Sequence, residues 1–120
     1  MTYSYDPKLT ASIIFNLRAE KGITQKEVES ELGISKGLVS HYETGRNALS
    51  LDVLYKYANY FDVSTDYILG RTNEKFNYAK YMSKTLYEGM KVSDVLNILT
   101  KMPKNERNSL ITIIKKMSEK

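Results

Sequence analysis

Hydrophobic residues recur along this chain at the three- and four-residue steps of amphipathic helices, and several of these runs end at a glycine. The first run predicts a helix over residues 9–21 that turns Ile14 and Leu17 toward a core, and Gly22 ends it. Residues 1–8 lack this pattern and are expected to form a loose arm.

Thr24 opens the second helical run, and Glu27 follows it at the spacing of a capping box. Val28 and Leu32 stand four residues apart on one face, and Gly33 is expected to end this helix in the left-handed conformation. The second helix is therefore short and leads directly into a turn.

Ser35 is a second N-cap candidate, and it predicts a further short helix that Gly45 ends. Val39 and Tyr42 form the inward pair of this helix. Two short helices joined by so tight a turn form a helix-turn-helix unit. The remaining face is small or polar, as expected of a helix that lies in a groove, and it carries Lys36, Gly37, Ser40 and His41.

Two more helices complete the first part of the chain. Ser50 is expected to cap a helix over residues 51–61, and Ser64 one over residues 65–69 that Gly70 closes. The residues expected to face inward from the longer of these helices are Leu51, Leu54, Ala58 and Phe61, with Tyr57 beside them. Five short helices with short connections predict an all-α fold, arranged as a small orthogonal bundle.

The C-terminal part is expected to be a polar linker over residues 72–77 and a helical tail over residues 78–120. Ser93 can cap one amphipathic helix, and Pro103 ends it and starts another. Lysines at the end of the last helix, Lys120 among them, suit its dipole. Apolar residues stand at helical steps in each of these helices and in the segment before them. They are Tyr78, Tyr81, Met82 and Leu86 in that segment, Val95, Leu96, Leu99 and Met102 in the first helix, and Leu110, Ile111, Ile113, Ile114 and Met117 in the second.

Composition excludes several kinds of site. The chain has 120 residues, no cysteine and one histidine, His41, so no disulfide, thiolate site or multi-histidine metal cluster is expected. No apolar run approaches the roughly 18 residues of a membrane span, and the first residues lack the apolar segment of a secretion signal. A cytoplasmic protein without a cofactor, a metal or a membrane partner is therefore expected.

The net charge of +4 is unevenly distributed along the chain. Residues 1–72 hold eight Lys and Arg against nine Asp and Glu, a net charge of −1. Residues 73–120 hold ten against five, a net charge of +5. If the helix-turn-helix part binds DNA, a few well-placed cations must do it, because bulk charge does not favour it.

The segments GITQKEVESELGISKGLVSHYETG and SLDVLYKYANYFDVSTDYILG together resemble the phage lambda-repressor/Cro-like helix-turn-helix domain, also called the xenobiotic-response-element type. Gln25, the turn at Gly33 and the step from Val63 to Ser64 all fall in register with that family. The resemblance implies a five-helix DNA-binding domain over residues 9–71 and a transcriptional regulator.

Two positions depart from the family pattern. Glu29 stands where the family usually has a small residue at the crossing of the two helices, and Leu49 stands where a proline is usual. Glu29 leaves two alternatives open, a wider crossing of the helices or a side chain that bends outward. The resemblance also implies a salt bridge between Arg18 and Glu43, whose loss would leave a partly buried charge without its partner.

The position of the second helix of the motif predicts which side chains meet DNA. Lys36 can donate to guanine O6 or N7, and a thymine methyl group would be an apolar partner for Leu38. The residues predicted to contact bases are Lys36, Gly37, Leu38, Ser40 and His41. The resemblance implies that the phosphate contacts come from Gln25, Ser35, Thr44, Arg46 and Asn47. An ordinary solvated face and a polar loop are the alternative interpretations of these residues.

The sequence thus predicts a sequence-specific regulator that binds a double-stranded operator, acts as a repressor and forms a homodimer through residues 78–120. A monomer whose tail packs on its own first domain is the alternative arrangement. The alternative function is a protein-interaction module of the same fold, such as an antitoxin or an antagonist of a related regulator, with a protein partner. No catalytic constellation is present to predict an enzyme. The operator, the regulated genes and any inducing ligand are not predicted.

Overall fold

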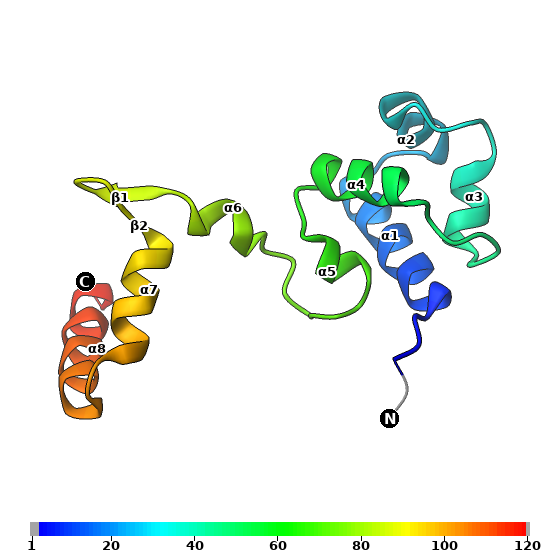
Figure 1. Ribbon diagram of the computed structural model, residues 1–120. Helices are drawn as coiled ribbons and strands as arrows, with labels where there is room; N and C mark the ends of the chain where they lie inside the picture. The colour runs from blue at the N-terminus through cyan, green and yellow to red at the C-terminus, as the bar shows by residue number, and fades with distance from the viewer. Residues whose placement is uncertain (1–2, 120) are drawn as a thin grey trace. The chain divides into compact units, whose positions relative to one another are not determined.

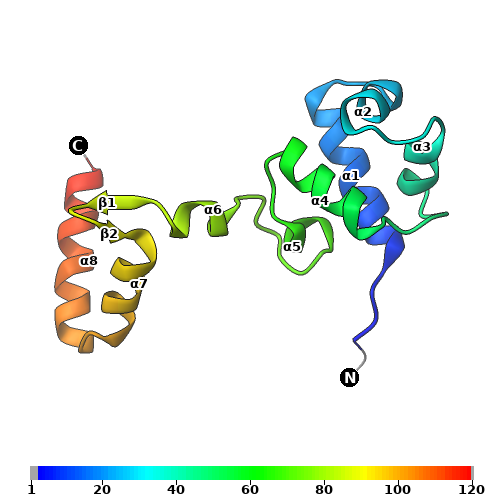
Figure 2. The ribbon, with the colours of Figure 1, turned by 45° about the horizontal axis from the view of Figure 1, so that its top comes forward.

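A computed structural model of the chain describes residues 3–119. These residues divide into two compact units, with the boundary between Asn77 and Tyr78. The first unit consists of helices, and the second combines helices with a small hairpin (Figures 1 and 2). The predicted all-α class is therefore confirmed, with the hairpin as an addition. Met1, Thr2 and Lys120, which belong to the predicted arm and the predicted last helix, lie outside the described residues.

Helix α1 spans Pro7–Lys21 and begins two residues earlier than the pattern predicts. The Asp6 carboxylate accepts a hydrogen bond from Lys8 N at 3.0 Å, so Asp6 is the N-cap. Pro7 occupies the first turn, where its missing N–H costs nothing. The prediction of a loose arm is therefore wrong for residues 6–8, because an acidic cap followed by proline is a helix start.

Helix α2 spans Gln25–Leu32 and begins at Thr24, as predicted. Glu27 N donates to the Thr24 hydroxyl at 3.1 Å, which is one of the two bonds of a capping box. Gly33 ends the helix with a φ of 63°, in the left-handed conformation that glycine adopts without strain. The short helix and its abrupt end are therefore both confirmed.

Helices α4 (Leu51–Tyr60) and α5 (Thr65–Ile68) begin at the predicted caps, Ser50 and Ser64. In each case the N–H three residues beyond the serine donates to its hydroxyl, at 3.2 Å and 3.0 Å. Phe61 and Leu69 are the C-terminal caps and are not part of these helices. Serine caps therefore fix both helix starts, and the ends differ from the prediction by one residue.

The buried face of α4 differs from the predicted one. Leu51 is 86% exposed, whereas Val53, Tyr57 and Ala58 are buried. Leu54 is only half-buried. The apolar arc of α4 is centred on the side that carries Val53, Tyr57 and Ala58. Leu51, in the first turn, lies at the edge of that arc. Helical spacing alone therefore assigned Leu51 wrongly to the core.

One hydrophobic core unites all five helices of the first unit. The Thr10 hydroxyl donates to the Ile68 carbonyl at 2.9 Å in the interior, which joins α1 to α5. The buried residues of the cluster are Ile14, Leu17, Val28, Leu32, Ile34, Val39, Tyr42, Val53, Tyr57, Ala58, Val63 and Ile68. The first unit therefore has the closed interior of an independently folding domain.

The second unit contains α6 (Tyr78–Met82) and a hairpin of β1 (Thr85–Tyr87) and β2 (Met90–Lys91). The strands are antiparallel, and the two residues between them, Glu88 and Gly89, both have positive φ. This is the requirement of a type I′ hairpin turn. Leu86, predicted to follow helical steps, therefore lies in a strand, because the turn at Glu88 and Gly89 reverses the chain just beyond the end of β1.

Helices α7 (Val92–Lys101) and α8 (Lys104–Ser118) complete the second unit and lie side by side in both views (Figures 1 and 2). Lys91 N donates to the Asp94 carboxylate at 2.9 Å at the start of α7. Ser93 is therefore inside the helix and is not its cap. Pro103 precedes α8, as predicted from its tolerance at a helix start.

Candidate nucleic-acid interface

Helix α3 spans Leu38–Glu43 and begins three residues later than the helix predicted from Ser35. Leu38 N donates to the Ser35 carbonyl at 3.1 Å, and Gly37 has a φ of 88° and a ψ of −13°. These values match the third position of a type II β-turn, which favours glycine. Ser35, Lys36 and Gly37 therefore form an exposed turn before the helix, and the prediction that Ser35 caps the helix and that Lys36 and Gly37 lie on it is wrong.

The physical reason is that Glu29 of α2, and not Ser35, caps α3. Glu29 Oε2 accepts from Gly37 N at 2.8 Å and from Val39 N at 3.3 Å. Glu29 is 9% exposed, so its side chain points into the interface between α2 and α3. The outward alternative for this residue is therefore wrong. The capping role of Glu29 was not predicted from the sequence. The signal available for it was a glycine, Gly37, at the start of α3 together with an acidic residue in the preceding helix.

The inward and outward faces of α3 follow the predicted pattern. Val39 and Tyr42 are buried in the core, as predicted. Ser40 and His41 are half-exposed on the opposite side. Leu38 is half-buried and packs against the core cluster, so only part of its side chain is available to a partner. The helix therefore presents a narrow polar strip next to the exposed turn that carries Lys36.

A second turn follows α3 and reverses the chain. The His41 carbonyl accepts from the Thr44 hydroxyl and from Asn47 N, each at 3.2 Å. Gly45 has a φ of 78°, and a Cβ atom there would lie 3.4 Å from a side-chain carbon of Lys8 in α1. Arg46 and Asn47 are exposed at this turn. The close approach to α1 fixes where the chain leaves α3.

The predicted salt bridge between α1 and the end of α3 is confirmed. Arg18 donates to both carboxylate oxygens of Glu43, at 2.7 Å and 2.9 Å, and to the Ile23 carbonyl at 2.9 Å. The Arg18 and Glu43 side chains are 15% and 3% exposed. The hydrogen bonds with Glu43 raise the pKa of Arg18 above its ordinary value, so the guanidinium keeps its charge.

Gln25, predicted to contact phosphate, belongs to the same network. Gln25 Nε2 donates to Glu43 Oε1 at 3.0 Å, and the residue is half-buried at the first position of α2. A side-chain amide has two N–H groups, so one hydrogen remains for another acceptor. The network therefore places Gln25 beside the C-terminal end of α3, while Glu29 holds the N-terminal end.

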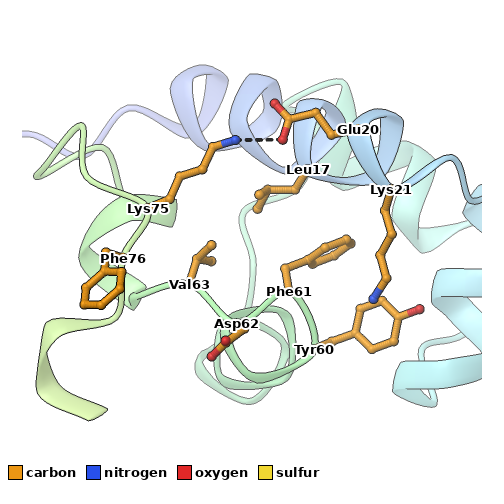
Figure 3. A pocket seen from close by; sticks show the side chains of 9 residues that line it. All are labelled: Leu17, Glu20, Lys21, Tyr60, Phe61, Asp62, Val63, Lys75 and Phe76. Carbon is orange, nitrogen blue, oxygen red and sulfur yellow. Dashed lines mark hydrogen bonds and ion pairs between the residues drawn. The ribbon is translucent and has the colours of Figure 1, made fainter. Parts of the chain in front are cut away.

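A pocket of the first unit lies apart from these residues (Figure 3). Its lining combines apolar side chains, such as Leu17 and Phe76, with the ammonium of Lys21, which lies 3.9 Å from the centre of the Tyr60 ring. Lys75 and Phe76, which fall in the predicted linker, reach this surface through the Lys75–Glu20 ion pair at 2.7 Å. None of the predicted DNA-contacting residues lines the pocket.

Over residues 3–119, no group of three or more His, Asp and Glu side chains is placed to hold a metal ion. None of the helices in the same range is both long and apolar enough to cross a membrane.

A helix-turn-helix unit inside a five-helix bundle, with an exposed polar strip on its second helix, defines the class of DNA-binding regulator domains. A family model described as helix-turn-helix matches residues 14–68. The chain belongs to the lambda-repressor/Cro-like helix-turn-helix family of transcriptional regulators.

Several curated relatives share this region. The HTH-type transcriptional regulator ImmR of Bacillus subtilis (strain 168) is 36% identical over 74 residues, which are 61% of this chain and 58% of ImmR. The uncharacterised HTH-type transcriptional regulator y4dJ of Sinorhizobium fredii is 39% identical over 67 residues, 56% of this chain and 87% of y4dJ. The SPbeta prophage-derived uncharacterised regulator YonR of Bacillus subtilis is 32% identical over 74 residues, 60% of this chain and 68% of YonR. The match therefore spans less than two thirds of ImmR, and no solved structure matches the chain.

Proposed function

We propose that this protein is a sequence-specific regulator that binds duplex DNA through α3 and its two flanking turns, and that it represses transcription by occupying a promoter. One observation carries the proposal. Val39 and Tyr42 anchor α3 in the core, and Ser40 and His41 form a half-exposed polar strip on its other side. A rigidly held helix with an exposed polar strip is what reading a major groove requires.

The proposed base contacts are the five residues predicted from the sequence. Lys36 is exposed at the turn and can donate to guanine, while Ser40 and His41 offer shorter polar groups from the helix itself. Leu38 would meet a thymine methyl group with the part of its side chain that the core leaves open. Gly37 would permit close approach and read nothing, because it has no side chain.

The proposed phosphate contacts lie at both ends of α3. Arg46 and Asn47 are exposed on the turn after the helix, and the remaining amide hydrogen of Gln25 lies near the same end. The Ser35 hydroxyl does not cap α3 and can bind a phosphate before the helix. Thr44 would have to turn its hydroxyl away from the His41 carbonyl to donate to a phosphate. Contacts at both ends would fix the register of α3 on the duplex.

We also propose that two copies associate through residues 78–120. None of the described residues in this unit is buried, and α8 leaves four large apolar side chains more than 40% exposed: Ile111, Ile113, Ile114 and Met117. A unit of roughly 40 residues rarely stabilises its own fold without a metal, a disulfide or a partner. A second copy supplies that partner and also gives the two readers that paired half-sites need.

Two substitutions test the roles at the DNA surface. Arg46→Ala is expected to weaken binding to all sequences alike. The slope of the logarithm of the binding constant against the logarithm of the salt concentration should become shallower by about 0.9 for each phosphate that is no longer neutralised. Lys36→Ala is expected to relax the preference at one base pair by roughly tenfold. Lys104→Ala, which removes an exposed charge at the start of α8, is the control and should change neither quantity. Identical binding profiles for the two variants would contradict the assigned roles.

A mobility shift with promoter fragments at moderate salt, compared with a pull-down of partners, distinguishes the alternative function. A protein-interaction module of the same fold would capture a protein partner and bind duplex DNA only weakly. A regulator is expected to act in the cytoplasm on the chromosome, and we assign it no catalytic group.

A further inference from the structure

The first turn of α3 has no cap of its own. The leading N–H groups of a helix lack intrahelical acceptors, and a side chain at the N-cap usually accepts from one of them. Gly37 occupies the N-cap of α3 and has no side chain, and the Ser35 hydroxyl makes no capping bond. The acceptor must therefore come from elsewhere in the fold.

Glu29 provides that acceptor from the middle of α2. One carboxylate oxygen accepts from two backbone N–H groups, Gly37 N at 2.8 Å and Val39 N at 3.3 Å. The intervening amide, Leu38 N, donates to the Ser35 carbonyl at 3.1 Å. Hydrogen bonds from N–H groups to a carboxylate are stronger than those to a neutral oxygen, and a negative charge at a helix N-terminus is favourable.

Lys36 is the residue that these bonds hold in place. It lies between Ser35, whose carbonyl closes the turn, and Gly37, whose N–H is bonded to Glu29. The backbone on both sides of Lys36 is therefore tied, one side within the turn and the other to α2. The same bonds occupy the N–H groups of residues 37–39, so these three backbone donors are not available to a phosphate or a base.

We propose that Glu29 is a positioning residue that sets which base pair Lys36 reads, without itself touching DNA. This inference rests on the proposed DNA-binding function. Because the N–H groups of residues 37–39 are occupied, base reading by this turn depends above all on where it holds the Lys36 ammonium. A shift of the turn would move that group away from its base edge while leaving the phosphate contacts after α3 in place.

Amide hydrogen exchange tests the structural half of the proposal on the full chain. Glu29→Ala is expected to speed exchange at Gly37 N and Val39 N by about tenfold or more, because both lose their acceptor. Glu31→Ala removes an exposed carboxylate from the same helix and is the matched control. Glu29→Asp keeps the charge but shortens the side chain, so it provides a milder variant if Glu29→Ala fails to fold. Unchanged exchange at both amides in a folded variant would overturn the proposal.

A double-mutant cycle on a selected operator tests the functional half. Glu29→Ala, or Glu29→Asp in its place, is expected to relax the preference at the base pair that Lys36→Ala relaxes, by up to about tenfold, with non-specific affinity within about twofold. In the Lys36→Ala background the same change should add no further loss of preference. Glu29→Gln retains an acceptor oxygen and is expected to keep the preference within about twofold.

The outcomes separate this inference from the proposed function. Losses that multiply in the double variant, losses at other base pairs, or equal losses of specific and non-specific affinity would show that Glu29 does not act through Lys36. The protein would still be a sequence-specific regulator in each of those cases. A wild-type chain with no preference among duplexes would overturn both proposals together.

Discussion

The two units of this protein reach order by different means. The first unit buries twelve hydrophobic residues in one core, and it adds a buried ion pair between α1 and α3. The second unit has well-formed helices and a hairpin, yet none of its described residues is buried. Regular secondary structure is therefore present in both units, but only the first has the interior that normally stabilises it.

This difference matches the two tasks that we propose for the units: the first unit would read DNA, and the second would bring two copies together. The first unit holds α3 through Val39, Tyr42 and Glu43, so the proposed DNA-reading surface needs no partner to keep its shape. The second unit leaves an apolar face on α8 that a second copy can cover. Association would then complete the fold of the second unit and bring two rigid reading surfaces to one operator.

The largest expected effect comes from placing a charge on the apolar face of the second unit. Ile114 is 53% exposed in the single chain, and we expect Ile114→Glu to prevent association because a glutamate there would be buried without a partner. Sedimentation equilibrium should show a single chain per particle. Operator affinity should fall by roughly 10²–10⁴-fold, since two linked readers become independent.

Asn108→Glu is the matched control, because it adds the same charge to the exposed polar side of α8. The control should remain dimeric. A wild-type chain that sediments as a monomer, or an Ile114→Glu variant that still dimerises, would show that this face is not the contact between copies.

A smaller effect is expected inside the first unit. Glu43→Gln removes the charge that Arg18 faces at 2.7 Å and leaves a largely buried guanidinium without its counter-ion. The free energy of unfolding should fall by roughly 3 kcal/mol, which urea denaturation can measure. Asp66→Asn removes a carboxylate from the exposed Arg71 pair and should have no measurable effect. A Glu43→Gln variant as stable as the wild type would contradict the structural importance of this bridge.

The smallest effect, and one of opposite sign, is expected at Tyr57. Its hydroxyl is buried and makes no hydrogen bond with any residue in the described part of the chain. Tyr57→Phe should therefore raise the free energy of unfolding by about 1 kcal/mol, because an unsatisfied polar group is removed. Tyr55→Phe changes an exposed tyrosine and is the control. Destabilisation by Tyr57→Phe would mean that a bound water molecule satisfies the hydroxyl.

Alkaline pH is expected to increase the difference in stability between Tyr57→Phe and the wild type. Burial raises the pKa of Tyr57, so the folded chain keeps this proton at pH values where the unfolded tyrosine, with an ordinary pKa of 10.0, releases it. The unfolded state then binds fewer protons, and stability falls as the pH rises above 10.0. The stability gap between Tyr57→Phe and the wild type should therefore widen above that pH.

Local signals predicted most of the first unit. Thr24, Ser50 and Ser64 start helices where the sequence places them, and Gly33 ends one. These signals act within one turn of a helix, so they can be recognised without knowledge of the fold. The salt bridge of Arg18 followed from the family resemblance and not from spacing, because its two residues lie far apart in the chain.

The errors arose where a distant residue decides the local structure. Ser35 is a good cap by type, but Glu29 accepts from Gly37 N and Val39 N, and Leu38 N donates to the Ser35 carbonyl. Leu51 fits a helical spacing, but the position of the core decides that it is exposed. Leu86 follows an approximately helical pattern, and the turn at Gly89 places it in a strand. A short apolar run does not distinguish these cases without its tertiary context.

Selection of bound sequences from a random pool of duplex DNA, with the full chain at moderate salt, tests the central claim most directly. The account predicts an enriched motif of two inverted half-sites about one helical turn apart, and a Lys36→Ala protein should select a motif relaxed at one position of each half-site. A pool with no enriched motif, or an identical motif for the wild type and Lys36→Ala, would contradict the claim that α3 and its leading turn read DNA.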